Sequence, residues 1–139
     1  MRNKLLLTIL TPEKTVFSDK EVDSVVIPAA GGEMGVLPGH APFAVQLREG
    51  ALHYRDGRHR ELFSISGGFA EIGGDKVLIL AEEAELAKEI DVERARQAYQ
   101  KAKAALAMRG ADLDLDAAQA ALRRAVARIR IAELKKKHK

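Results

Sequence analysis

The sequence predicts an α+β protein in which an antiparallel β sandwich or barrel precedes an antiparallel hairpin of two helices. Residues 4–79 contain short apolar or alternating runs between turn signals, and apolar side chains do not recur there with a helical period. Beyond residue 90 they recur every three or four residues in two stretches. We therefore assign residues 1–84 to a β domain and residues 85–139 to a helical hairpin domain.

The expected strands are short and follow one another closely. Asp56-Gly57 and Gly73-Gly74-Asp75 are typical of tight turns, which make the strands on either side antiparallel. The candidate strands are Leu5–Leu10, Thr15–Phe17, Val22–Ile27, Gly35–Leu37, Phe43–Leu47, Ala51–Arg55, Glu61–Ser66, Phe69–Ile72 and Val77–Leu80.

The segment from Gly31 to Pro42 is expected to be a shaped loop, because its glycines free the backbone and its prolines fix it. It lacks the Gly-Lys-Ser/Thr of a phosphate-binding loop, and no helical pattern follows it. His40 lies within this segment without a nucleophile motif or metal-ligand spacing. We therefore interpret His40 as a structural or interface residue.

An acidic connector, residues 82–89, is expected to join the β domain to the first helix. Asp91 is a favourable N-cap for that helix, which should end near Arg109-Gly110. Three aspartates, Asp112, Asp114 and Asp116, are candidate caps of the second helix, and Asp116 with Gln119 forms a possible capping box.

The two helices should meet along a narrow seam made largely of alanine. Alanine permits a close approach but buries little apolar area, at about 25 cal/mol per Å². Such a hairpin should be easy to open, and therefore suited to be a switch. The seam positions are Val92, Ala95, Tyr99, Ala102 and Leu106 in the first helix, and Leu115, Ala118, Leu122, Ala125, Ile129 and Ala132 in the second.

The composition excludes several classes of function. The absence of cysteine excludes disulfides and cysteine metal sites, and 4% aromatic residues leave little material for stacking on bases. The N-terminal apolar run stops at Pro12, so we expect neither export nor membrane insertion. Residues 1–89 hold 10 basic and 14 acidic residues, whereas residues 90–139 hold 13 and 6. The basic tail therefore predicts an acidic partner surface.

Four segments carry a resemblance to a known family. They are Gly35–Pro42 (GVLPGHAP), Ser66–Phe69 (SGGF), Ile90–Ala95 (IDVERA), and Arg123-Arg124-Ala125 followed by Arg128. In order and spacing they resemble the epsilon subunit of the bacterial F-type ATP synthase, over nearly the whole chain.

The resemblance implies a sandwich of about ten strands followed by the two helices, in a non-catalytic rotor subunit that couples proton transport to ATP synthesis. It implies binding to the gamma subunit and the c-ring, at the cytoplasmic face of the bacterial cell membrane and attached only through the complex. It also implies that the helices can extend toward the alpha and beta subunits and inhibit ATP hydrolysis. No cofactor is required, and ATP is a possible regulatory ligand.

The resemblance also suggests site residues. Those that match its ATP-binding signature are Glu85, Asp91, Arg94, Arg124 and Arg128, whereas Lys101 stands where ATP-binding members carry arginine. A lysine keeps the charge but lacks the planar fork that grips phosphate in two places. The similar family loop faces the c-ring, which makes Glu33 and His40 candidate interface residues. The candidate inhibitory tail is formed by Arg123, Arg124, Arg128, Arg130, Lys135 and Lys136.

Other interpretations of these residues, and of the function of the chain, stay open. Arg124 and Arg128 share a helical face and are suited to hold a phosphate chain with Arg94, but the same pattern is typical of a solvated surface. An alternative function is a nucleic-acid-binding β barrel with a basic tail, which the scarcity of aromatic residues and the acidic head disfavour. A third is a small hydrolase using His40 and Glu33, although no nucleophile or metal set accompanies them.

Overall fold

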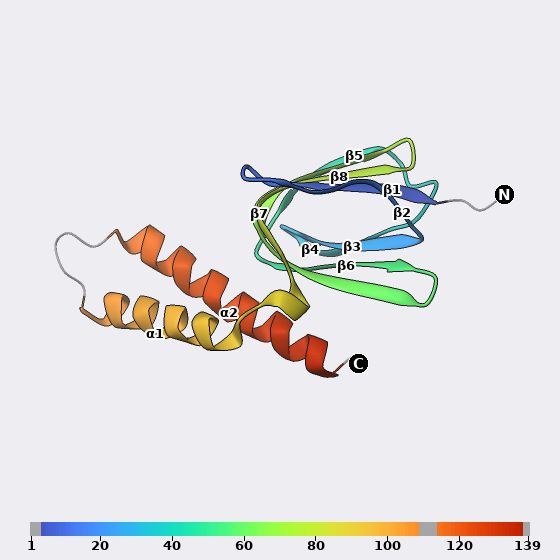
Figure 1. Cartoon of the computed structure of the whole chain (residues 1–139). Helices are drawn as coiled ribbons and strands as arrows, with labels where there is room; N and C mark the ends of the chain where they lie inside the picture. The colour runs from blue at the N-terminus through green and yellow to red at the C-terminus, as the bar shows by residue number, and fades with distance from the viewer. Residues whose placement is uncertain (1–3, 109–113, 138–139) are drawn as a thin grey trace.

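The computed structural model describes residues 4–108 and 114–137. Figure 1 shows a β sandwich with two helices side by side below one of its ends. Within the described residues the elements are, in order, β1 (Leu5–Leu10), β2 (Thr15–Val22), β3 (Ser24–Ala29), β4 (Gly32–Val36), β5 (Phe43–Leu47), β6 (Gly50–Asp56), β7 (His59–Gly73), β8 (Lys76–Leu86), the 3₁₀ turn η1 (Ala87–Glu89), α1 (Val92–Met108) and α2 (Leu115–Lys137).

The strands form one folded sheet in the order β2-β1-β8-β7-β5-β3-β4, with β6 bridging β3 and β7. The expected antiparallel neighbours are confirmed for consecutive strands such as β6 and β7. An unexpected parallel pair joins β1 to β8, with Leu6 opposite Lys76 and Leu10 opposite Leu80. Turn signals do not predict this pair, because the two strands are far apart in the sequence.

The long strand β7 belongs to both layers of the sandwich. Its first half pairs with β6 as far as Ile65, and its second half pairs with β5 from Gly68 onward. Gly68 has φ +120°, and a Cβ added there would lie 2.1 Å from the carbonyl oxygen of Leu80. Glycine therefore permits the bend at the change of partner. The prediction of two separate strands, Glu61–Ser66 and Phe69–Ile72, was wrong because β8 pairs across this bend.

The core of the sandwich is made of large apolar side chains. In β1, Leu5, Leu7 and Ile9 are fully buried, as the period of two in a strand requires. Phe17, Tyr54 and Phe63 add edge-to-face and tilted ring contacts within the core. This packing makes the sandwich, which we call the head, a rigid support for the two helices.

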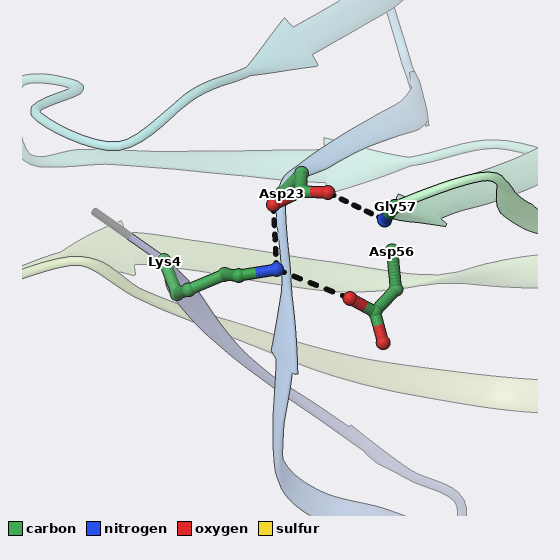
Figure 2. Close-up of polar contacts among 4 residues, drawn as sticks. All are labelled: Lys4, Asp23, Asp56 and Gly57. Carbon is green, nitrogen blue, oxygen red and sulfur yellow. Dashed lines mark hydrogen bonds and ion pairs between the residues drawn. The ribbon is translucent and has the colours of Figure 1, made fainter. Parts of the chain in front are cut away.

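Polar contacts also fix Lys4, which directly precedes β1, to the sandwich (Figure 2). Lys4 Nζ lies 2.6 Å from Asp23 Oδ1 and 3.1 Å from Asp56 Oδ1, and the backbone N–H of Gly57 donates to Asp23 Oδ2 at 2.6 Å. The lysine therefore joins the beginning of β1 to the β2–β3 junction and to the β6–β7 turn.

Two predicted irregular segments were partly wrong. The predicted strand at Gly35–Leu37 begins earlier than expected, because residues 32–34 of the expected loop also belong to β4 and pair with β3, so the loop shrinks to residues 37–42. Residues 82–86 of the expected acidic connector extend β8, because Ala84 and Leu86 pack on the core and the strand pairs with β7 as far as Phe63. Backbone pairing outweighs the acidic composition there.

The helical hairpin agrees with its predicted seam over most of its length. Ala95 and Ala102 of α1 and Ala125 and Ala132 of α2 are buried, whereas Leu115 is exposed. Asp114 caps α2, since its Oδ1 accepts the N–H of Ala117 at 3.0 Å. The capping box at Asp116 and Gln119 was therefore wrong, because Asp116 lies inside the first turn. Asp112 and the expected turn at Arg109-Gly110 lie outside the described residues.

Neither described helix is both long and apolar enough to cross a membrane.

Candidate functional site

The surface that joins the helical hairpin to the sandwich is small and combines alanines with a few larger aliphatic side chains. Ile131, with 2% of its surface exposed, packs with Ala132 of α2 against Ala87 and Ile90. Ala51 of β6 and Leu62 of β7 complete this contact from the sandwich, and Val92 from α1. We call these seven residues the apolar contact. Sequence reasoning missed Ile131, which stands next to the predicted seam position Ala132.

Two ion pairs also join α2 to the sandwich. Arg128 Nε and Nη2 donate to Glu85 Oε1 and Oε2 at 3.0 and 3.3 Å, and Nη2 lies 2.9 Å from Oε1. Arg123 Nε lies 3.5 Å from Glu49 Oε1. The bidentate Arg128–Glu85 pair is the stronger kind, because a planar guanidinium matches a carboxylate in geometry as well as in charge. It joins α2 directly to the end of β8.

A small polar cavity of about 20 Å³ lies between α2 and the sandwich. Its lining includes Arg124 and Arg128 from α2 and Ser64 and Ser66 from β7, and the Ser66 hydroxyl oxygen has no hydrogen-bond partner. Three carboxylates complete the polar lining, those of Glu49, Glu83 and Glu85. A cavity of this size accommodates about one water molecule, not a nucleotide.

The structure brings together half of the predicted ATP-binding residues, namely Glu85, Arg124 and Arg128. Asp91 caps α1, as predicted, by accepting the N–H of Arg94 at 3.1 Å. The Arg94 side chain and Lys101 are exposed on α1 and do not line the cavity between α2 and the sandwich. The nucleotide role of all six residues stays a prediction.

The basic residues of the predicted tail have different surroundings. Arg123 and Arg128 are paired with Glu49 and Glu85 of the sandwich, whereas Arg130 is exposed. The side chains of Lys135 and Lys136 lie outside the described residues. In this conformation, two of the charges proposed for an acidic partner are therefore held by the head of the same chain.

The two predicted interface residues, Glu33 and His40, lie at different places. Glu33 is near the start of β4 and lines a cavity of about 250 Å³ with Leu134 of α2. His40 lies in the loop after β4, where the backbone N–H of Gly39 donates to Asp75 Oδ1 at 2.7 Å. The His40 and Phe43 rings are arranged edge to face, with 6.5 Å between their centroids. The loop is thus held to the turn between β7 and β8.

His53 lines the same cavity as Glu33. The two nitrogens of its ring lie 3.3 and 3.4 Å from Arg60 Nη2. Burial lowers the pKa of His53, and the positive charge of Arg60 lowers it further, whereas the nearby Glu33 has a smaller effect in the opposite direction. His59 and Lys88 approach the neighbouring Glu61 at 2.9 and 3.7 Å. The protonated form of His53 is therefore disfavoured beside the hairpin.

An apolar outer face of the sheet was missed by sequence reasoning. Phe69 and Leu80 are directly opposite each other in β7 and β8 and expose 44% and 43% of their surface. Leu10 of β1 lies opposite Leu80, so the apolar row crosses three neighbouring strands, and the polar Gln46 of β5 lies opposite Phe69 at its end. Apolar residues at successive positions in 78–80 were the available signal, since a strand with one wet face alternates.

Both parts of the chain match known protein families. Residues 4–87 match the family described as ATP synthase, Delta/Epsilon chain, beta-sandwich domain, and residues 88–133 match its long alpha-helix domain. The ATP synthase epsilon chain of Syntrophobacter fumaroxidans is 50% identical over 133 residues, covering 96% of this chain and 98% of that one. The epsilon chain of Symbiobacterium thermophilum is 46% identical over 127 residues, covering 91% of each.

Two solved structures have similar folds. A chain of the Euglena gracilis mitochondrial ATP synthase, solved as OSCP/F1/c-ring, has a TM-score of 0.78 and 27% identity, covering 96% of this chain and 83% of that one. A chain from the Tetrahymena thermophila central stalk and c-ring has a TM-score of 0.60 at 14% identity, covering 93% of each, and shows likeness of fold alone.

Proposed function

This chain belongs to the epsilon-chain family of the ATP synthase, and from that premise we propose that it is a rotor subunit that restrains ATP hydrolysis with its helical hairpin. Its proposed partners are the gamma subunit and the c-ring, and the alpha and beta subunits when the hairpin extends. It is peripheral, at the cytoplasmic face of the bacterial membrane, through the complex. The family membership favours this role over nucleic-acid binding or hydrolysis by the single chain.

The head offers two surfaces for these partners. The outer row around Phe69 and Leu80 is a flat apolar face of the kind that a stable subunit contact buries, and we assign it to gamma. The loop after β4 exposes Leu37, and Phe43 at the start of β5 is exposed beside His40; we assign this surface to the c-ring. Asp75 holds this loop in shape through the N–H of Gly39.

The observation that carries the regulatory role is the small apolar contact, in which Ile131 is the one large residue that α2 contributes. Separating α2 from the sandwich exposes little apolar area, so the cost is modest. A helix rises 1.5 Å per residue, so about forty residues reach roughly 60 Å along a shaft. The freed hairpin is therefore long enough to reach a catalytic head, and its basic side chains suit an acidic surface there.

ATP is the proposed regulatory ligand of the folded form. A ligand that binds one form alone favours it by RT ln(1 + [L]/Kd), about 2.7 kcal/mol at a hundredfold excess. Arg124 and Arg128 are one turn apart in α2 and are suited to a phosphate chain. Lys101 contributes a point charge where a fork would bind more tightly, so we expect weak affinity.

Deletion of residues 90–139 tests the regulatory role in the assembled ATP synthase. We expect ATP hydrolysis to rise, most of all at low ATP, while assembly is retained through the head. Deletion of residues 138–139 alone is the control and should leave the rate unchanged. Equal rates for the full chain and the 90–139 deletion, at both low and high ATP, would reject the inhibitory role.

Titration of the isolated chain with ATP tests the nucleotide site. Arg124→Ala should weaken binding, because one of the two guanidiniums is lost, whereas Arg96→Ala on the exposed surface of α1 removes an equal charge and should not. An absence of binding at millimolar ATP would reject the nucleotide site.

A further inference from the structure

Two arginines stand directly opposite each other on the outer face of the sandwich. Arg55 of β6 pairs with Arg60 of β7, and Ser24 of β3 lies on the other side of Arg55. Val25 and Tyr54, which follow Ser24 and precede Arg55, are buried in the core, so the row itself faces outward. We propose that this donor row, Ser24, Arg55 and Arg60, is a phosphate-binding site. It shares no residue with the proposed nucleotide site and goes beyond the proposed function.

No acidic side chain balances the two arginines within the described residues. Like charges directly opposite each other destabilise a sheet. Both side chains are exposed, and none of the described carboxylates forms an ion pair with either, although residues 1–89 hold more acidic than basic residues. The neighbouring carboxylates, those of Asp56 and Glu61, are engaged with other cations. The repulsion between Arg55 and Arg60 is therefore left for a bound anion to neutralise.

The guanidinium of Arg60 is held in place by the ring of His53. Its Nη2 lies 3.3 Å from His53 Nδ1 and 3.4 Å from Nε2. An approach in the plane of the ring would bring Nη2 onto the carbon between the two nitrogens, so the guanidinium rests against the ring face, where arginine stacks well. Stacking of this kind does not require an N–H donor. Arg60 is thus positioned in advance while its donors remain suited to a ligand.

The geometry of the row suits phosphate better than carboxylate. Neighbouring strands are about 4.8 Å apart, and a tetrahedral phosphate has enough oxygens to accept from two guanidiniums at once. His53 and Arg60 also line the cavity of about 250 Å³, but Glu33 and Glu61 line it too and repel an anion. The phosphate therefore binds on the open side of Arg60, beside Arg55. Free phosphate and the headgroup of an anionic lipid both carry this chemistry.

Titration of the full chain with inorganic phosphate, at constant ionic strength, tests the site. Arg60→Gln should weaken binding about tenfold, equivalent to about 1.4 kcal/mol, because one of the two guanidiniums is lost. Arg58→Gln is the matched control, since it removes an equal charge from the exposed β6–β7 turn, outside the donor row, and should leave binding unchanged. Equal weakening by the two variants would indicate a general attraction of charge and overturn the site.

Unfolding in urea provides a second readout. Without phosphate, Arg55→Gln should raise the midpoint of unfolding, because it relieves the repulsion across the two strands. Phosphate should raise the midpoint of the unaltered chain and leave that of Arg55→Gln nearly unchanged. A lower midpoint for Arg55→Gln without phosphate would mean that the pair stabilises the fold by itself, and would overturn the argument for a bound anion.

Vesicles identify the source of the phosphate. If the ligand is a lipid headgroup, vesicles that contain phosphatidylglycerol should bind the unaltered chain and Arg58→Gln more tightly than Arg60→Gln, with phosphatidylcholine vesicles as the control. Binding of inorganic phosphate without this difference assigns the site to soluble phosphate. Binding of neither would overturn the site. Arg124→Ala should leave phosphate binding at the donor row intact, so failure of the nucleotide site is distinguishable from failure of this one.

Discussion

The sandwich and the helical hairpin bury side chains of different size. This difference predicts that the sandwich is the more stable of the two. The sandwich buries large residues such as Leu5, Ile27 and Phe63, which interdigitate across two layers. The described seam between the helices buries alanines, and the apolar contact adds Ile131. Because buried apolar area sets most of the stabilisation, the head should persist under conditions that release the tail.

The largest effect is expected from breaking the head. Phe63→Ala removes a buried ring that contacts Phe17 and Tyr54. It should lower the free energy of unfolding by about 3 to 5 kcal/mol. Denaturation in urea measures this loss, with Phe69→Ala on the outer face as the control. A loss of similar size in both variants would contradict the assignment of the core.

A smaller effect is expected at the apolar contact. Ile131→Ala should cost about 2 kcal/mol, at the low end for such a change because Ala51, Ala87 and Ala132 are small residues of the same apolar contact. The cost should fall on closure of the hairpin, with unfolding of the sandwich unchanged. Amide hydrogen exchange in α2 and in β1 distinguishes the two. Faster exchange in β1 would mean that the head and tail unfold as one unit.

A cap substitution sharpens the comparison further. Asp114→Ala should destabilise α2 by about 1 kcal/mol, since the N–H of Ala117 loses its acceptor. Asp116→Ala, inside the first turn, should cost a few tenths of a kcal/mol through the helix dipole alone. Helicity measured during thermal unfolding gives both values, and a reversed order would restore Asp116 as the cap.

The smallest effect concerns pH. The pKa of His53 is lowered in the folded chain from its usual value near 6.5, so the unfolded chain binds more protons. Stability should therefore fall as the pH drops through 6.5 and level off below the folded pKa. His53→Gln should remove this part of the slope that the unaltered chain shows. Urea unfolding between pH 5 and 8 measures both slopes.

Much of the fold could be predicted from local patterns. The bounds of β1 and β5 agree with the prediction, because alternating apolar residues and turn signals are local properties. The pairing of β1 with β8 could not be predicted, nor the bend in β7, because both depend on strands that meet only in the folded chain. Residues 82–86 show the same limit, since their acidic composition suggests a connector and their pairing makes them a strand.

The site was less accessible to such reasoning. Asp91 was found from its place before an amphipathic helix, and the structure confirms it as a cap. Glu85 and Arg128 were identified through a family resemblance, and their mutual pairing joins residues 43 positions apart. The outer row of Phe69 and Leu80 was missed because strands were read for one buried face. Contacts between residues far apart in the sequence, and strands with apolar side chains on both faces, are difficult to predict from local sequence patterns.

The position of β8 determines how the sandwich responds to a force that pulls on the helical hairpin. This strand leads directly into η1 and the helices, and it lies between β1, its parallel neighbour, and β7. A force along the strand would load many backbone hydrogen bonds at once in shear, rather than open them one by one. The helical hairpin is thus attached to the sandwich through a strand that resists a pulling force, because its hydrogen bonds to β1 and β7 would have to break together.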